Sequence, residues 1–162
     1  MKEKSASQLN VNTIGGIRVA ASAGLSYFPA VSGAASATAD GNSIKDSSYG
    51  LNLGFGDFTI GGAYRIIDND NSTTDGTVYA IGAAYQSGPI AASVSYLKGS
   101  HNGTAAVGDD TFTQSIISVA YTMGPGVDLM GAIFNLSYKD EGGAAANNNS
   151  GTGGLVGLRL MF

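Results

Sequence analysis

Three arginines are the residues of this sequence best suited to act on a solute. Arg18, Arg65 and Arg159 each lie in a segment where apolar residues occupy every second position, and each arginine falls in the alternate set. A guanidinium is charged at every physiological pH and therefore attracts anions. Asn52 and Asn135 are interpreted as members of the same polar set. These residues can recognise or orient a solute, or they can simply solvate a polar interior and pair with loop carboxylates.

Other chemistry is weakly represented. The stretch DNDNSTTDG contains Asp68, Asp70 and Asp75, three carboxylates that could hold a structural Ca²⁺ in a loop. It lacks the glycine and the distal glutamate of an EF-hand, so a solvated loop without metal is the favoured interpretation. The chain has no cysteine, and no Ser-His-Asp or paired-carboxylate arrangement falls on one face. We therefore expect neither an enzyme nor a further cofactor.

Composition narrows the class of protein. The 162 residues are 43% hydrophobic but only 12% charged, and 25 of them are glycine. A net charge of −4 argues against a nucleic-acid partner, because no basic stripe is present to neutralise phosphates. No apolar run approaches the roughly 18 residues of a membrane-spanning helix. Residues 1–13 carry no apolar stretch of a secretory signal and are expected to form a flexible segment before one domain.

The elements that must position the arginines are amphipathic strands. Hydrophobic residues alternate with small or polar ones in segments of about ten residues, which is the length of a tilted membrane-spanning strand. In the seventh segment, which can be read in either parity, we take Met130 and Phe134 as outward-facing and Asn135 as inward-facing. Eight such segments are expected, over residues 17–28, 48–55, 57–67, 76–87, 89–99, 111–123, 127–140 and 153–162.

The connections alternate between tight Gly or Gly-Pro turns and long polar loops. GFGD, QSGP and TMGPG are short, whereas KGSHNGTAAVGDD and KDEGGAAANNNSGTG are long. Short turns on one side and long loops on the other are typical of outer-membrane barrels. The sequence therefore predicts an all-β, antiparallel transmembrane β-barrel of about eight strands. Closure of eight strands would make the first and last strands neighbours and would place Arg18 beside Arg159.

Particular stretches resemble a known family. YGLNLGFGDFTIGGAYR, YTMGPGVDLMGAIFNLSYKDEG and GLVGLRLMF resemble the C-terminal half of Gram-negative general porins, in particular the α-proteobacterial type. The resemblance extends over about residues 14–162. It implies half of a sixteen-stranded barrel in the outer membrane, surrounded by lipid and lipopolysaccharide. It also implies passive diffusion of small hydrophilic solutes and ions, and assembly into homotrimers.

The resemblance has two further implications. A last strand ending in Phe162 resembles the strand by which the outer-membrane assembly machinery recognises its clients. Arginines on the barrel wall of the family face the acids of a constriction loop, and Arg18, Arg65 and Arg159 would take that role here. Nothing in the sequence matches the constriction loop itself.

Two alternatives to a porin remain at this point. One is a small eight-stranded outer-membrane barrel without an open pore, acting structurally or by binding through its loops. An interior of eight strands is just filled by side chains, whereas sixteen to eighteen strands leave an aqueous channel. The inward positions here are mostly Gly, Ala, Ser and Thr, which suits the wider barrel. The other alternative, a soluble β-sandwich, would need more charged residues on its outer faces.

Overall fold

The computed structural model describes residues 4–29, 43–70, 75–102, 108–140 and 148–161. Every regular element in these residues is a β-strand, and no helix in them is long and apolar enough to cross a membrane. The strands are β1 (Lys4–Ile14), β2 (Ile17–Phe28), β3 (Ile44–Phe55), β4 (Phe58–Asn69), β5 (Gly76–Ser87), β6 (Ile90–Asn102), β7 (Asp109–Gly124), β8 (Val127–Lys139) and β9 (Asn149–Leu160).

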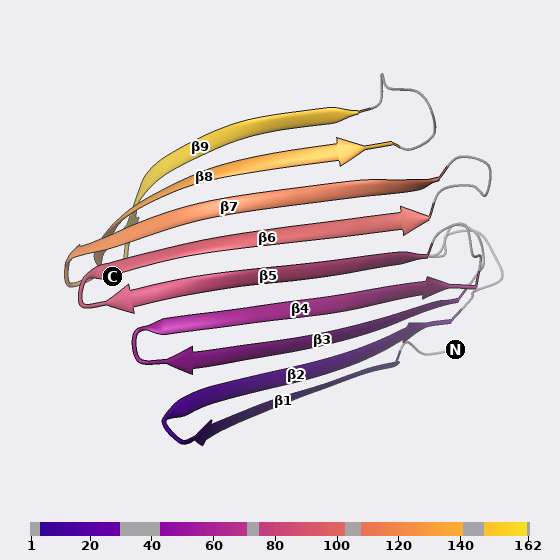
Figure 1. The fold of residues 1–162 in the computed structure, drawn as a ribbon, viewed down its shortest axis with the longest axis horizontal. Coiled ribbons are helices and arrows are strands. Elements are labelled where there is room, and N and C mark those ends of the chain that lie inside the picture. The colour runs from indigo at the N-terminus through magenta and orange to yellow at the C-terminus, as the bar shows by residue number, and fades with distance from the viewer. Residues whose placement is uncertain (1–3, 30–42, 71–74, 103–107, 141–147, 162) are drawn as a thin grey trace.

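The nine strands form one antiparallel sheet in chain order, from β1 to β9 (Figure 1). Each strand pairs only with its neighbours in the sequence, so β1 and β9 are the two edges of the sheet. The sheet curves but does not close on itself. The prediction of an all-β antiparallel fold is confirmed, but the predicted closure into a barrel is not seen, because the sheet remains open between β1 and β9.

The two rims of the sheet differ, as the sequence predicts. Tight hairpin turns join β1–β2, β3–β4, β5–β6 and β7–β8 at one edge, here called the turn rim. The opposite edge, where β1 begins and where the strand ends joined by the longer connections lie, is called the loop rim (Figure 1). In the first turn, Gly15 and Gly16 have φ of 58° and 82°. Two consecutive positive φ angles are what a two-residue hairpin turn of type I′ requires, and glycine adopts them without strain.

The expected eight strands and the flexible segment over residues 1–13 are corrected by the structure. Residues Lys4–Ile14 form a ninth strand, paired with β2 along its whole length. Leu9 and Val11 of β1 pair with Ser22 and Ala20, on the face opposite to the one that carries the apolar residues of β2. The apolar alternation of β1 is therefore short, and its apolar residues lie on the face opposite to those of β2. For this reason the sequence of β1 does not by itself predict a strand that continues the pattern of β2.

The faces of the sheet follow from the strand pairing. On β7, Ile117 and Val119 are exposed, whereas Ser118 and Ala120 between them are half-buried. In a curved sheet the more exposed side chains lie on the convex face, so Ile117 marks the convex face and Ser118 the concave face. No hydrophobic side chain among the described residues is fully buried, and many large ones are exposed. A single sheet has no core of its own, so its apolar face must be covered by lipid or protein.

The parity of β8 differs from the expectation. Ile117 pairs with Ile133, which places Ile133 and Asn135 on the convex face and Met130 and Phe134 on the concave face. The pairing shifts by one residue between Thr122 and Gly124, at the start of the β7–β8 turn. Such a bulge adds one residue to one strand and exchanges the faces of the positions that follow. The expectation of an inward Asn135 and an outward Met130 and Phe134 is wrong for this reason.

Candidate functional site

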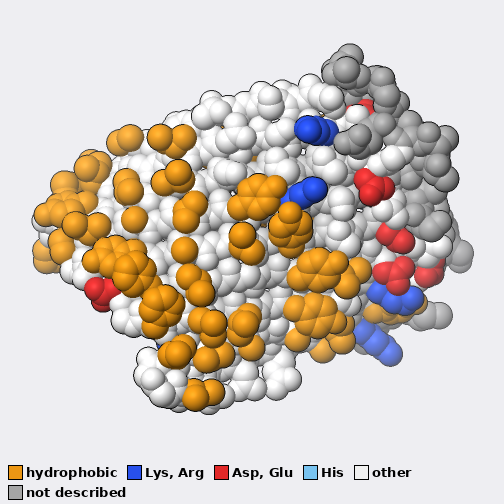
Figure 2. Space-filling model, in the orientation of Figure 1, with side chains coloured by type: hydrophobic (Ala, Val, Ile, Leu, Met, Phe, Trp, Pro, Cys, Tyr) orange, Lys and Arg blue, Asp and Glu red, His pale blue; other side chains and the backbone are white. Residues whose placement is uncertain are grey.

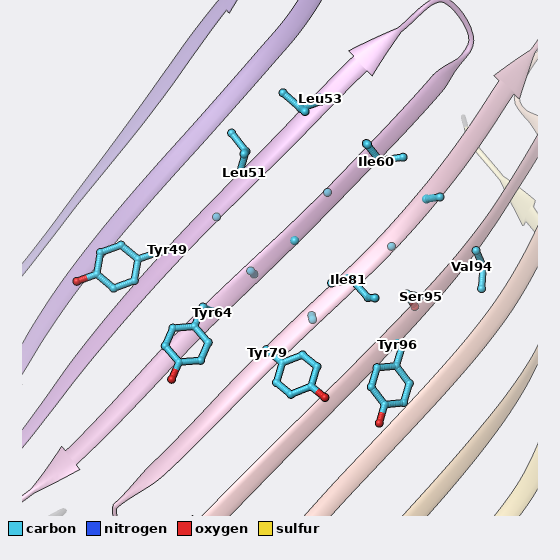
Figure 3. A pocket seen from close by; sticks show the side chains of 17 residues that line it. Tyr49, Leu51, Leu53, Ile60, Tyr64, Tyr79, Ile81, Val94, Ser95 and Tyr96 are labelled. Carbon is cyan, nitrogen blue, oxygen red and sulfur yellow. The ribbon is translucent and has the colours of Figure 1, made fainter.

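Aromatic side chains frame the convex face near both rims. Tyr49, Tyr64 and Tyr79 are direct cross-strand partners on β3, β4 and β5, and Tyr96 of β6 lies 6.2 Å from Tyr79 between ring centroids. Figure 3 shows these four rings in a row, with their hydroxyl groups on the side away from the neighbouring apolar residues. Tyrosine carries an apolar ring and a polar tip, so such a row is suited to the boundary between hydrocarbon and water.

A second aromatic group lies nearer the turn rim. Phe58 of β4 contacts Phe55 of β3 and Tyr85 of β5, with ring centroids 6.0 and 4.9 Å apart. Tyr79 and Tyr85 are six positions apart on β5, which corresponds to about 20 Å along an extended strand. Strands of outer-membrane barrels tilt by about 35–45°, so this length spans roughly 15 Å across the membrane, which fits within the roughly 25 Å height of their apolar band. The apolar zone between the two aromatic groups is therefore short enough to lie inside such a band.

The zone between the aromatic groups is apolar, and the charges lie outside it. Leu51, Ile60, Ile81 and Val94 line a shallow hollow beside the tyrosine row (Figure 3). Figure 2 shows hydrophobic side chains spread over most of this face, with the acidic and basic side chains gathered mainly toward the loop rim. Isolated peptide groups and charges are costly in hydrocarbon, and this face presents neither in its central zone.

The concave face is lined by small side chains. Its central positions, read from the strand pairing, are occupied mainly by glycine, alanine and serine, among them Ser22, Gly50, Gly61, Ala63, Ala80, Gly82, Ala84, Ala91, Ser93, Ser95, Ser118 and Ala120. Hydroxyl groups on this face bond across strands, as Ser93 Oγ and Ser118 Oγ do at 2.7 Å. Small hydroxyl-bearing side chains leave space in front of the wall and keep it wettable.

Longer polar side chains of the concave face lie flat along the wall. Asn52 lies over Gly61, where an added Cβ would come 1.8 Å from its Oδ1 atom. Arg18 lies over Gly54, its Nε and Nη2 atoms 3.3 Å from the place that a Cβ would occupy. The missing side chain of each partner glycine makes room for the polar group. The concave placement of Arg18 and Asn52 agrees with the sequence interpretation.

Two of the three arginines are held in ion pairs on this face. Arg65 Nε donates to both oxygens of Asp46, at 2.9 and 3.0 Å. Arg159 Nε donates to Asp128 Oδ2 at 2.9 Å, and Thr122 Oγ1 donates to Asp128 Oδ1 at 2.7 Å. Asp128 is only 3% exposed, and its negative charge is compensated within the wall by these two hydrogen bonds. The bidentate geometry of Arg65 is the strong form of such a pair.

Arg18 differs from the other two arginines. Among the described residues no carboxylate pairs with it, so its positive charge is uncompensated there. Arg18 on β2 and Arg159 on β9 both lie toward the turn rim, but β3 to β8 separate them in the sheet. The expected basic patch made of Arg18 and Arg159 is therefore absent from this structure, because the ninth strand and the open edges remove the neighbour relationship on which it depended.

The inverted parity of β8 produces a feature that the sequence interpretation missed. Asn135 lies on the convex face, where its Nδ2 donates to Thr152 Oγ1 at 2.9 Å. The concave positions of β8 are instead taken by Met130, Ala132, Phe134 and Leu136, beside Leu155 of β9. This apolar strip differs from the central concave positions of β3 to β6, which are mainly small. The sequence signals for it are the ambiguous parity of this segment and the Gly-Pro-Gly turn that precedes β8, which is compatible with a bulge.

The three aspartates considered for Ca²⁺ have separate partners in the structure. Asp68 lies 3.6 Å from Lys45 Nζ, Asp70 accepts a hydrogen bond from Ser43, and Asp75 Oδ1 accepts one from the backbone N–H of Asn69 at 2.8 Å. The hydrogen bond from Ser43 lowers the pKa of Asp70 below its ordinary value. Among the described residues no three acidic, histidine or cysteine side chains gather as a metal site, and residues 71–74 of this loop lie outside them.

Comparisons with known proteins agree with this geometry. The sequence model of the Gram-negative porin family matches residues 2–141. A search of curated protein sequences finds no match. Among solved structures, a BenF-like porin from Pseudomonas fluorescens Pf-5 superposes with a TM-score of 0.77 at 15% identity, over 98% of this chain and 47% of that chain.

Two other solved structures show the same fold. OpdK, an outer-membrane protein of Pseudomonas aeruginosa, gives a TM-score of 0.71 at 16% identity, covering 98% of this chain and 49% of that one. The trimer form of OmpT, an outer-membrane protein of Vibrio cholerae, gives 0.63 at 15% identity, over 98% and 56% of the two chains. This chain therefore spans about half the length of the solved structures it matches.

Proposed function

The chain belongs to the Gram-negative porin family of outer-membrane proteins, and from this membership we propose that its sheet forms part of the wall of a passive diffusion pore. The solutes are small and hydrophilic, ions included. The family and the fold are those of a channel rather than of an enzyme.

The opposite chemistry of the two faces carries the proposal. The convex face is apolar between two aromatic groups, as lipid contact requires, and the concave face is small and polar, as a water-filled lumen requires. Flat-lying polar groups such as Asn52 over Gly61 keep the lumen clear while still offering hydrogen bonds to passing solutes. A solute then crosses by diffusion, and the wall selects by width and charge.

Arg18 is the residue to which we assign the ion preference of this wall. Arg65 and Arg159 are neutralised by Asp46 and Asp128. The electric field of each pair is that of a dipole, which weakens with distance faster than the field of a single charge. Arg18 retains a net positive charge near the turn rim and attracts anions over the range of the Debye length, about 8 Å at physiological salt. The pore is accordingly expected to favour anions at this level.

The alternative of a small, plugged barrel with a loop-binding role is not favoured by the observations. Nine strands are described and the sheet between β1 and β9 is open. Small concave side chains would leave voids in a narrow closed barrel, and voids cost stability. The same side chains suit a wide pore, for which sixteen to eighteen strands are typical.

We extend the proposal to the finer features of the resemblance. The chain corresponds to the C-terminal half of general porins of the α-proteobacterial type. Its surroundings are outer-membrane lipid and lipopolysaccharide, its last strand is read by the assembly machinery, and it works in a homotrimer. The trimer form of the structurally similar OmpT from Vibrio cholerae supports the oligomer.

Planar-bilayer recording tests this function. The chain is recovered from outer membranes of cells that express it, in mild detergent and without denaturation, so that its native assembly is kept. We expect discrete open steps whose conductance rises in proportion to the bulk conductivity of KCl. Membranes that contain the folded chain but conduct no ions would overturn the proposal.

A further inference from the structure

The faces of β1 do not match those of its neighbour β2. The pairing with β2 places Asn10 and Asn12 of β1 on the convex face, and Leu9 and Val11 on the concave face. The apolar side chains of β2 lie on the convex face instead. Leu9 is 69% exposed, so nothing in the described sheet covers it. In this register β1 therefore presents amide groups where β2 presents hydrocarbon.

The amide groups lie at the level of the lipid zone. Asn10 pairs with Ala21, and Ala21 pairs with Leu51, one of the residues that line the apolar hollow of the convex face. A carboxamide that leaves water for hydrocarbon without a hydrogen-bond partner loses free energy of hydration, whereas leucine and valine gain from the same transfer. Contact with lipid therefore disfavours the observed register of β1.

A shift of β1 by one residue along β2 exchanges its faces. Side chains alternate with a period of two, so such a shift moves every residue of the strand to the other side of the sheet. Thr13 then pairs with Ile17, and Leu9 pairs with Ala21. The backbone ladder keeps all but one of its described residue pairs. Within the described sheet β1 has a strand neighbour on one side only, so the shift disturbs no other pairing (Figure 1).

The glycines of the first turn permit the shift. The observed turn consists of Gly15 and Gly16, and both have positive φ. After the shift the turn contains Ile14, Gly15 and Gly16. The common three-residue hairpin is a type I turn followed by one residue in the left-handed region, and Gly16 with φ of 82° already has that conformation. A shift in the opposite direction would place Ile17 at the left-handed position, which a β-branched residue resists.

We propose that β1 takes a second register in the outer membrane, shifted by one residue so that Leu9 and Val11 face lipid. Asn10 and Asn12 then join the concave wall. Asn12 becomes the cross-strand neighbour of Arg18, which has no carboxylate partner among the described residues. Lipid contact drives the shift, and the Gly15–Gly16 turn accommodates it. The inference requires that the convex face meets lipid, and it does not depend on whether the wall conducts ions.

Two pairs of cysteines distinguish the registers, because the chain has no cysteine of its own. Leu9→Cys with Ser22→Cys places two thiols face to face in the observed register. Gln8→Cys with Ser22→Cys does so in the shifted register. In the other register each pair lies on opposite faces, with Cβ atoms that point apart and cannot be bridged without backbone movement.

Both pairs are oxidised in the full chain, in outer membranes of cells that express it. We expect the disulfide between positions 8 and 22 to form on the order of tenfold faster than the one between positions 9 and 22. A faster disulfide between positions 9 and 22, equal rates, or no disulfide in either pair would overturn the inference.

Substitutions in the turn give an independent readout. Gly15→Ala is strained in the observed turn, where Gly15 has φ of 58°, but not in the three-residue turn. Gly16→Ala is strained in both turns. Neither added Cβ meets an atom within 4 Å, so backbone conformation alone decides the outcome. In lipid vesicles we expect Gly15→Ala to leave the urea midpoint of unfolding unchanged and Gly16→Ala to lower it.

Losses of similar size for the two glycine variants, or a loss for Gly15→Ala alone, would also overturn the inference. Conductance is recorded separately on the same membranes. A chain that shows the shifted disulfide but conducts no ions upholds the inference and contradicts the proposed function.

Discussion

Arg159 on β9 and Asp128 on β8 form an ion pair on the concave face, with Arg159 Nε donating to Asp128 Oδ2 at 2.9 Å. Thr122 on β7 donates to the other carboxylate oxygen at 2.7 Å. The last three strands are thereby joined by side chains as well as by their backbones. Arg18 has the same charge on the same face but lacks a carboxylate partner among the described residues. The arginines thus divide into two that are held in ion pairs and one that has no carboxylate partner among the described residues.

Replacement of Arg159 is expected to weaken the sheet. Arg159→Gln leaves the nearly buried Asp128 carboxylate with only the hydroxyl of Thr122, so the urea concentration at the midpoint of unfolding should fall. Arg18→Gln is the matched control, because it removes an arginine that makes no ion pair with the described residues. Equal midpoints for the two variants would contradict the structural role of Arg159.

Replacement of Arg18 is expected to change ion selectivity instead. Arg18→Glu reverses the uncompensated charge. One unit charge about 4 Å away in water acts on an ion with roughly 1 kcal/mol, so the reversal raises the energy of an anion there by roughly 2 kcal/mol, and the anion-to-cation permeability ratio should fall at least about thirtyfold. The reversal potential under a KCl gradient measures this ratio in the native assembly. Arg18→Lys retains the charge and should leave the potential unchanged. A reversal potential that Arg18→Glu does not move would remove Arg18 from the lumen.

A charge on the convex face should be costly, and the same charge one residue further should not. Ile117→Arg places a guanidinium in the lipid zone and should lower the free energy of unfolding by about 2–4 kcal/mol. Ser118→Arg carries the same side chain to the concave face, where water reaches it, and should cost much less. Unfolding in lipid vesicles measures both variants. Similar losses for the two would show that the faces are not chemically distinct environments.

The apolar strip of β8 offers a test of packing on the concave face. Phe134 covers Gly153 of β9, where an added Cβ would lie 2.4 Å from the ring. Gly153→Ala should therefore displace the ring and lower the free energy of unfolding by about 1–3 kcal/mol. Gly157→Ala on the same strand meets no atom within 4 Å and serves as the control. An unchanged stability for Gly153→Ala would show that Phe134 does not pack there.

Much of the fold could be predicted because period-two alternation and turn chemistry are local properties of the sequence. The segments from Ile17 onward alternate nearly throughout, and tight glycine turns separate the strands of each hairpin. β1 escaped prediction because Leu9 and Val11 are its only large apolar residues before Ile14, and they lie on the concave face. A polar strand at a sheet edge forms because it pairs with the neighbouring strand, and this pairing cannot be predicted from the amino-acid composition of the edge strand alone.

The candidate site was predictable only where a strand is regular. Arg18, Arg65 and Asn52 follow the simple alternation and lie on the concave face. Asn135 does not, because one extra residue near the β7–β8 turn exchanges the faces of β8. The partners of Arg65 and Arg159 depend on the cross-strand register, which places Asp46 and Asp128 within reach. Sequence alternation alone contains no register, so it could not separate the two paired arginines from Arg18.

Cysteine scanning of β7 tests most directly the central claim that one face of this sheet meets lipid and the other meets water. The chain contains no cysteine, so single replacements from Ile116 to Ala120 report without background. In the native assembly in vesicles, a charged thiol reagent should modify the concave positions Ile116, Ser118 and Ala120 and spare Ile117 and Val119. A fluorophore at the spared positions should be quenched by lipid-borne quenchers. Uniform modification along β7, without a period of two, would contradict the account.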